Sequence, residues 1–164
     1  MPAVHPSPTL RFNRTISLLF ACALAGLTLP AGCALVSIDR ANADSTGLAI
    51  HGYDPVAYFT LSAATPGLAE FAMEYKGARW LFANAKHREL FAAEPAKYLP
   101  AYGGYCAYGM AWGVRVDVDP TAWEIAGGRL YLMNTAGVLN ESWIPERSSN
   151  IKAADDWWAS RAGE

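Results

Sequence analysis

After residue 43, two histidines and one cysteine are the candidates for binding a metal ion or for nucleophilic catalysis. After residue 43 the sequence contains no histidine or cysteine other than His51, His87 and Cys106. Imidazole nitrogens and thiolates both bind copper and zinc, and a thiolate beside an imidazole can act as a nucleophile. We take His87, Cys106 and His51 as candidate metal ligands and assign no catalytic residue.

His87 has the strongest positional signal of the three. It is the third residue of a helix predicted over 85–93, for which Asn84 is a suitable N-cap. The positive end of the helix dipole disfavours imidazolium there, so we expect a neutral ring, the form that binds metal. The alternative is a half-exposed helical residue without a function.

Cys106 lies in a glycine-rich segment, and Met110 follows it four residues later. A helix at 105–112 would place both sulfur atoms on one face, and Cu(I) prefers such ligands. Both side chains could equally fill a core, where free cysteine and methionine are common. His51 precedes a glycine and an Asp-Pro turn, and it is either a ligand or an ordinary loop residue.

The surrounding pattern predicts one compact α+β domain. Residues 70–75 and 78–82 alternate around Lys76-Gly77 and predict a hairpin, and residues 123–126 and 129–132 predict a second one around Gly127-Gly128. Asp54-Pro55 suits the start of a short helix, and Ser149 could cap a last helix. No repeat or linker is visible in the sequence.

Composition excludes several classes of protein. The 164 residues are 52% hydrophobic and 17% charged, which is incompatible with a disordered chain. The net charge is −2 and no Lys/Arg stripe occurs, so we expect no nucleic-acid partner. The chain also lacks a G-x-S-x-G elbow, a phosphate-binding glycine loop and an H-E-x-x-H pair.

The N-terminus has the pattern of an export signal. Arg11 and Arg14 precede an apolar run at 15–36, and Ala41-Asn42-Ala43 matches the small-x-small cleavage site. This pattern predicts a signal peptide at 1–43 and a periplasmic chain at 44–164. That chain would hold ten basic and fourteen acidic residues, a net charge of −4, and Cys106 as its one thiol.

Two other readings of the N-terminus stay open. Leu29-Pro30-Ala31-Gly32-Cys33 resembles a bacterial lipoprotein box, in which Cys33 would be lipidated and retained. The apolar run is also close to the roughly 20 residues that a membrane span requires. We expect membrane contact only through this segment or through a lipid on Cys33.

Five motifs occur together in one order: Tyr53-Asp54-Pro55-Val56-Ala57-Tyr58-Phe59, Trp80-Leu81-Phe82, 84–91, Glu94-Pro95-Ala96-Lys97-Tyr98 and Gly103-Gly104-Tyr105-Cys106-Ala107. This combination resembles the YHS domain family, most closely its exported bacterial single-domain branch. The likeness is close from Ala49 to about Gly113. The resemblance implies that 44–164 form a single YHS-like domain. Its small treble-clef-like core would combine a hairpin and helices, extended by a second hairpin and a C-terminal helix.

The resemblance also implies a metal site, from which this chain departs. Typical YHS domains are thought to bind metal through cysteines, whose positions correspond here to Ala57, Ala83 and His87. Two of those thiolates are absent and the third position is an imidazole, so a closed tetrahedral thiolate site cannot form there. A rebuilt site could combine His87 and Cys106 with His51 or Met110.

From these residues we expect an exported metal-binding or metal-handling module without catalytic activity. Copper is the favoured ion, zinc the alternative, and the partner is that ion or a periplasmic protein. A second hypothesis is a ligand- or protein-interaction domain that keeps the YHS fold and has lost the metal site. A third is an enzyme with Cys106 as nucleophile and His87 or His51 as base.

Overall fold

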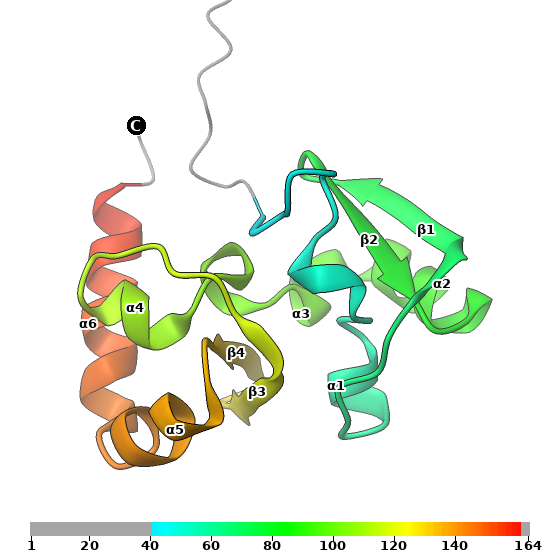
Figure 1. Ribbon diagram of the computed structural model, residues 1–164. Coiled ribbons are helices and arrows are strands. Elements are labelled where there is room, and N and C mark those ends of the chain that lie inside the picture. The colour runs from blue at the N-terminus through cyan, green and yellow to red at the C-terminus, as the bar shows by residue number, and fades with distance from the viewer. Residues whose placement is uncertain (1–40, 162–164) are drawn as a thin grey trace, which may run out of the picture. The chain divides into compact units, whose positions relative to one another are not determined.

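The computed structural model describes residues 41–161, which form a mixed α+β fold. The expected α+β class is therefore confirmed, with two separate two-stranded antiparallel sheets (Figure 1). We call residues 50–98 the first half; it comprises η1 (Ile50–Gly52), α1 (Ala57–Thr60), β1 (Leu68–Tyr75), β2 (Ala78–Phe82), α2 (Ala85–Ala93) and α3 (Pro95–Tyr98). We call residues 101–160 the second half; it comprises η2 (Ala101–Gly104), α4 (Ala107–Ala111), β3 (Asp119–Ala126), β4 (Arg129–Met133), α5 (Ala136–Val138), η3 (Leu139–Trp143) and α6 (Arg147–Ser160).

Both predicted hairpins are present. In the first, Tyr75 pairs with Ala78 across the Lys76-Gly77 turn, and in the second Ala126 pairs with Arg129 across Gly127-Gly128. Each hairpin joins an eight-residue strand to a five-residue strand and contains a register shift near its open end. The alternating pattern and the tight turns are therefore sufficient to position both hairpins.

Helix α2 has the bounds that the sequence predicts. The Asn84 side chain accepts a hydrogen bond of 2.8 Å from the His87 backbone N–H, the expected N-cap interaction. The last helix differs from expectation, because α6 begins at Arg147 and Ser149 lies inside it. The Ser149 hydroxyl donates to the Glu146 carbonyl, so it bonds backward along the chain and does not cap the helix.

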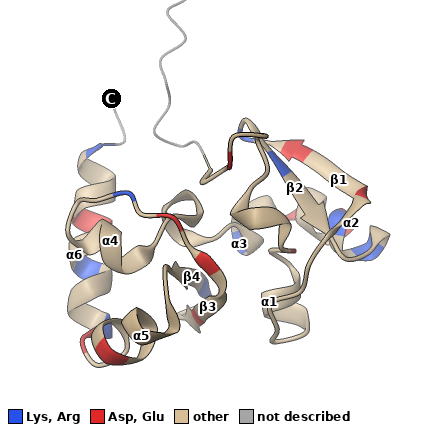
Figure 2. Cartoon of the chain, viewed as in Figure 1, with Lys and Arg blue, Asp and Glu red and all other residues tan. Residues whose placement is uncertain are grey.

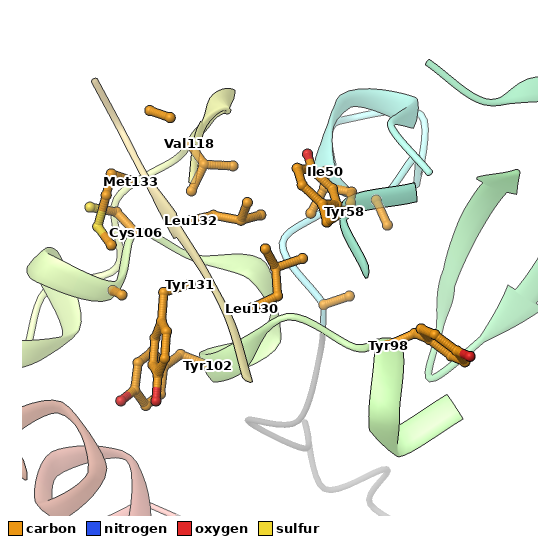
Figure 3. Packing of buried hydrophobic residues seen from close by; sticks show 14 of the residues in the cluster. Ile50, Tyr58, Tyr98, Tyr102, Cys106, Val118, Leu130, Tyr131, Leu132 and Met133 are labelled. Atoms are coloured by element: carbon orange, nitrogen blue, oxygen red, sulfur yellow. The ribbon is translucent and has the colours of Figure 1, made fainter. Parts of the chain in front are cut away.

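The core is continuous across β4. Four of its five residues are buried, so this strand has apolar neighbours on both faces. In Figure 3, Leu130 and Leu132 extend toward Ile50 and Tyr58 of the first half, and Tyr131 and Met133 extend toward Tyr102 and Cys106. The ring of Tyr58 also meets Trp123 edge-on, and its hydroxyl donates to the Pro120 carbonyl. The two hairpins therefore share one core.

The two halves repeat one arrangement of elements, although no repeat is visible in the sequence. Four pairs of elements begin 51 residues apart: η1 and η2, β1 and β3, β2 and β4, and α2 and α5. Two details recur with the same spacing. His51 and Tyr102 both adopt positive φ, and Asn84 and Thr135 both cap a following helix. Different residues satisfy the same local geometry, which hides the repeat from inspection of the sequence.

No helix within residues 41–161 is both long enough and apolar enough to span a membrane. Residues 1–40 of the predicted signal peptide (1–43), which include Cys33 of the lipoprotein box, lie outside the described residues. Figure 2 shows acidic and basic residues dispersed over the elements, in agreement with the absence of a basic stripe from the sequence.

Candidate functional site

Asp54 lies at the centre of the most connected polar group in the first half. Its side chain is fully buried. One carboxylate oxygen, Oδ1, accepts from the backbone N–H groups of Val56 and Ala57 at 2.8 and 3.3 Å. The other, Oδ2, accepts from the N–H of Ala83 at 2.8 Å and lies 2.5 Å from Nδ1 of His87. One side chain thus holds the start of α1, the end of β2 and the first turn of α2.

His87 is buried, with 6% of its surface exposed, and both ring nitrogens have partners. Because Asp54 is a carboxylate that already accepts from Ala83, Nδ1 is the donor of this pair. The other nitrogen, Nε2, lies 3.2 Å from the Thr60 hydroxyl, which can also donate to the Val56 carbonyl. The alternative of a half-exposed residue is therefore wrong, because the third position of α2 faces the core.

Cys106, 52 residues after Asp54 and so one position beyond the 51-residue spacing, occupies a similar place in the second half. Both Asp54 and Cys106 follow a Gly-Tyr pair and precede a short helix, and Cys106 is the N-cap residue of α4. Its thiol is 2% exposed, and Sγ lies 3.7 Å from Oδ1 of Asn134, to which it can donate weakly. Asn134 is 51 residues beyond Ala83, so the same two segments are joined in each half by different chemistry.

Met110, the possible additional sulfur ligand, is completely buried in the core. Its backbone N–H donates to the Cys106 carbonyl at 3.0 Å, so the two residues do share one helical turn as expected. The Cys106 N–H is bound by the carbonyl of Val116 at 2.9 Å. These bonds fix the segment around the thiol within the core.

His51 forms a third, more exposed group. Its Nε2 lies 3.0 Å from Oδ1 of Asp117, and the same oxygen accepts from the side chain of Asn42 and the backbone of Val118. Partial burial by itself would raise the pKa of Asp117, but the hydrogen bonds from Asn42, Val118 and His51 outweigh it and lower that pKa. Asp117 is therefore held as a carboxylate that joins the two halves.

The three sequence-predicted ligands thus lie in three separate hydrogen-bonded groups. Within residues 41–161, no group of three or more His, Cys, Asp or Glu side chains is arranged to hold a metal ion. The atoms of Asp54 and His87 that could bind a metal ion already have hydrogen-bond partners. Asp54 accepts four hydrogen bonds, and Nε2 of His87 faces Thr60. Within residues 41–161, the ring nitrogens of His87 and the carboxylate of Asp54 therefore have protein partners in this conformation.

Asp54 is the site residue that the sequence analysis missed. It was expected only as the N-cap of a short helix starting at Pro55, but α1 begins at Ala57 with Val56 as its N-cap residue. The Asp54 side chain still accepts from the N–H groups of Val56 and Ala57 in the turn that leads into α1. The contacts with Ala83 and His87 span 29 and 33 residues of sequence. No local pattern reports such contacts; the Asp-Pro dipeptide was the only available signal.

A second surface feature lies at the end of α4. Trp112 is 71% exposed, whereas none of the other five tryptophans is among the exposed large side chains of the described residues. Its ring meets Tyr108 edge-on, and Val114, two residues later in the sequence, is also exposed. We call Tyr108, Trp112 and Val114 the α4 apolar patch.

No protein-family model, curated protein or solved structure matches this chain.

Proposed function

We propose that this protein is an exported, non-catalytic binding module built on a YHS-like core. In this proposal Asp54 and His87 hold together the segments that a metal ion holds in typical members of that family. One observation carries it. The residues at the three positions of the family's cysteines, Ala57, Ala83 and His87, all bond to the Asp54 carboxylate.

The order of elements supports the finer part of the proposal, the treble-clef-like core. A turn containing Asp54, the hairpin β1–β2 and helix α2 follow one another, and one buried side chain contacts all three. A metal ion in such a core contributes folding free energy by cross-linking these elements. A buried carboxylate with four donors can do the same without metal, because each donor offsets part of its desolvation cost.

The α4 apolar patch is the surface that we assign to binding. Tryptophan and tyrosine dominate the energetics of protein interfaces, and an exposed tryptophan beside a tyrosine is a suitable anchor. The following residues Asp117 and Asp119 carry negative charge, and the pKa of each is lowered by hydrogen bonds that outweigh burial. With the mature chain at −4, the partner is a periplasmic protein that presents an apolar side chain next to basic residues.

Metal titration tests the first part of the proposal. We expect the purified protein to bind neither Cu(I) nor Zn(II) more tightly than micromolar, and its thermal midpoint to be unchanged by a chelator. Micromolar or tighter binding that His87→Ala abolishes would contradict the proposal. Cys106→Ser is the matched variant, because it removes another of the three predicted ligands, the one in the opposite half.

A photo-crosslinking residue at position 112 tests the second part. We expect one discrete adduct in the periplasm, formed less when excess wild-type protein competes and unaffected when a Trp112→Ala protein competes. The same crosslinker at Leu61, which is 55% exposed on the first half, is the control. Equal adducts from both positions would contradict a specific surface at the α4 apolar patch.

Metal handling is the second candidate, and one observation favours it. A histidine that donates Nδ1–H to a carboxylate presents Nε2 in the orientation that metal-ligating histidines commonly have. Coordination would require Thr60 to turn away and further ligands to approach, and the titration above detects this outcome. A Cys/His enzyme has less support, because the described contacts of Cys106 Sγ include neither imidazole.

A further inference from the structure

The segment Ala41–Ala43 forms part of the folded domain. Ala41 and Asn42 are both buried, at 9% and 8% exposure, and Ala43 forms an antiparallel bridge with Ala49. Ala41 also lines a small cavity together with Trp80 of β2 and Trp158 of α6. These three residues are the small-x-small motif after which the sequence predicts cleavage.

Asn42 makes four hydrogen bonds, and they join the two halves. Its carbonyl accepts from the N–H of Ile50 in η1 at 3.1 Å, and its own N–H donates to the carbonyl of Gly103 in η2 at 2.7 Å. Its side-chain amide donates to the Gly104 carbonyl at 3.2 Å and to Asp117 Oδ1 at 2.8 Å. Asn42 therefore bridges the two equivalent turns of the repeated arrangement.

Cleavage after Ala43 would remove all of these bonds. The N–H of Ile50 and the carbonyls of Gly103 and Gly104 would lose this partner, and Asp117 would lose a donor that helps to lower its pKa. Buried polar groups without partners are costly, and mature domains seldom contain them. The cut would therefore produce a damaged interface between η1 and η2.

We infer that residues 41–43 belong to the mature protein and that the bond after Ala43 is not the processing site. The sequence offers two alternatives that keep Asn42. One is processing at the lipoprotein box, where water hydrolyses the Gly32–Cys33 peptide bond to leave a Gly32 carboxylate and a Cys33 amine. The other is retention of the apolar segment as an uncleaved anchor. Either preserves the interface, and the inference rests on export and not on the proposed binding function.

The mass of the exported protein tests the inference directly. The full chain is exported from a bacterial host, and its N-terminal peptide is identified by mass spectrometry. A first residue at or before Ala41 supports the inference. A lipid-bearing Cys33 that Cys33→Ser removes assigns the lipoprotein route, and an intact Met1 assigns the anchor. A mature chain beginning at Asp44 overturns the inference.

Thermal midpoints of chain variants test the inference independently. Asn42→Ala in the full chain should lower the thermal midpoint by about 10 °C, since it deletes the two buried side-chain hydrogen bonds to Gly104 and Asp117 in a domain of this size. Ser45→Ala, an exposed substitution three residues later, should leave it within about 1 °C. A second pair of chains, starting at Ala34 and at Asp44, should differ by at least as much. Equal midpoints in both comparisons would overturn the structural basis of the inference.

Discussion

The two halves of this protein use the same scaffold but join it with different polar chemistry. In the first half a buried carboxylate contacts the end of the hairpin and the next helix. In the second half a buried thiol contacts the equivalent point through one weak bond. Each junction connects the segment before a hairpin to the residue just after that hairpin, Ala83 or Asn134. The comparison shows that the scaffold requires a connection at this point but not a particular pair of groups.

The second half compensates with contacts that the first half lacks. Helix α6 packs against α4 and supplies Asp155, which receives two hydrogen bonds from Arg129 and one from the Tyr102 hydroxyl. The side chains of Trp143 and Arg147 both donate to Glu124 on β3. The weak thiol contact therefore lies inside a larger helical cover, whereas the first half depends on Asp54.

The largest expected loss of stability comes from substituting Asp54. Asp54→Ala deletes four hydrogen bonds and leaves His87 without its carboxylate, so we expect a loss of about 3–5 kcal/mol in unfolding free energy. Urea denaturation measures it. Asp54→Asn keeps the shape and one acceptor, so it should fold and still lose more than half as much. A loss below 1 kcal/mol in both variants would remove the distinction between the halves.

A glycine substitution tests the contact between η1 and η2. A Cβ on Gly104 would lie 2.8 Å from Cγ2 of Ile50, and its φ of +87° is strained for any other residue. Gly104→Ala should therefore cost about 2–4 kcal/mol. Gly77→Ala is the matched control, with φ +73° and nothing within 4 Å of its Cβ, and should cost about 1 kcal/mol.

Equal losses at Gly104 and Gly77 would mean that backbone strain accounts for the whole effect. The two halves would then be joined less closely at their turns than the contact with Ile50 indicates.

Alkaline unfolding compares one buried tyrosine from each half. Burial raises the pKa of both Tyr58 and Tyr102, and in Tyr102 the hydrogen bond to Asp155 raises it further. The fold keeps these phenols neutral while the unfolded chain ionises near pH 10, so their stabilisation is complete below about pH 10 and falls as pH rises toward their folded pKa. The slope that each contributes should be small at pH 9 and approach about 1.4 kcal/mol per pH unit near pH 11.

Urea denaturation between pH 9 and 11 measures that slope, and Tyr58→Phe or Tyr102→Phe should each reduce it. An unchanged slope in Tyr102→Phe alone would mean that the second half opens before its tyrosine ionises.

The smallest expected effect is at the thiol. Cys106→Ala removes one weak hydrogen bond and a small apolar volume, so we expect a loss of about 1 kcal/mol, well below that of Asp54→Ala. In the native protein the buried thiol should react with a disulfide reagent much more slowly than in urea. Rapid native reaction would show that α6 does not cover this site as the static contacts indicate.

The sequence by itself determined the local elements. Alternation around Lys76-Gly77 and Gly127-Gly128 positioned both hairpins, and Asn84 fixed the start of α2, because turns and caps depend on neighbours a few residues away. The expected Ser149 cap was wrong for a related reason, since a serine can bond backward within a helix as well as cap one.

Only the tertiary structure decided which of these residues meet. His87 was selected from its helix position, yet its partner Asp54 lies 33 residues earlier. Asn42 bonds to Gly103, Gly104 and Asp117, which lie at least 61 positions later in the sequence. The 51-residue repeat also appeared only in three dimensions, because different side chains satisfy the same backbone geometry. Spacing along the chain reports local conformation, whereas a buried polar group finds its partners through packing.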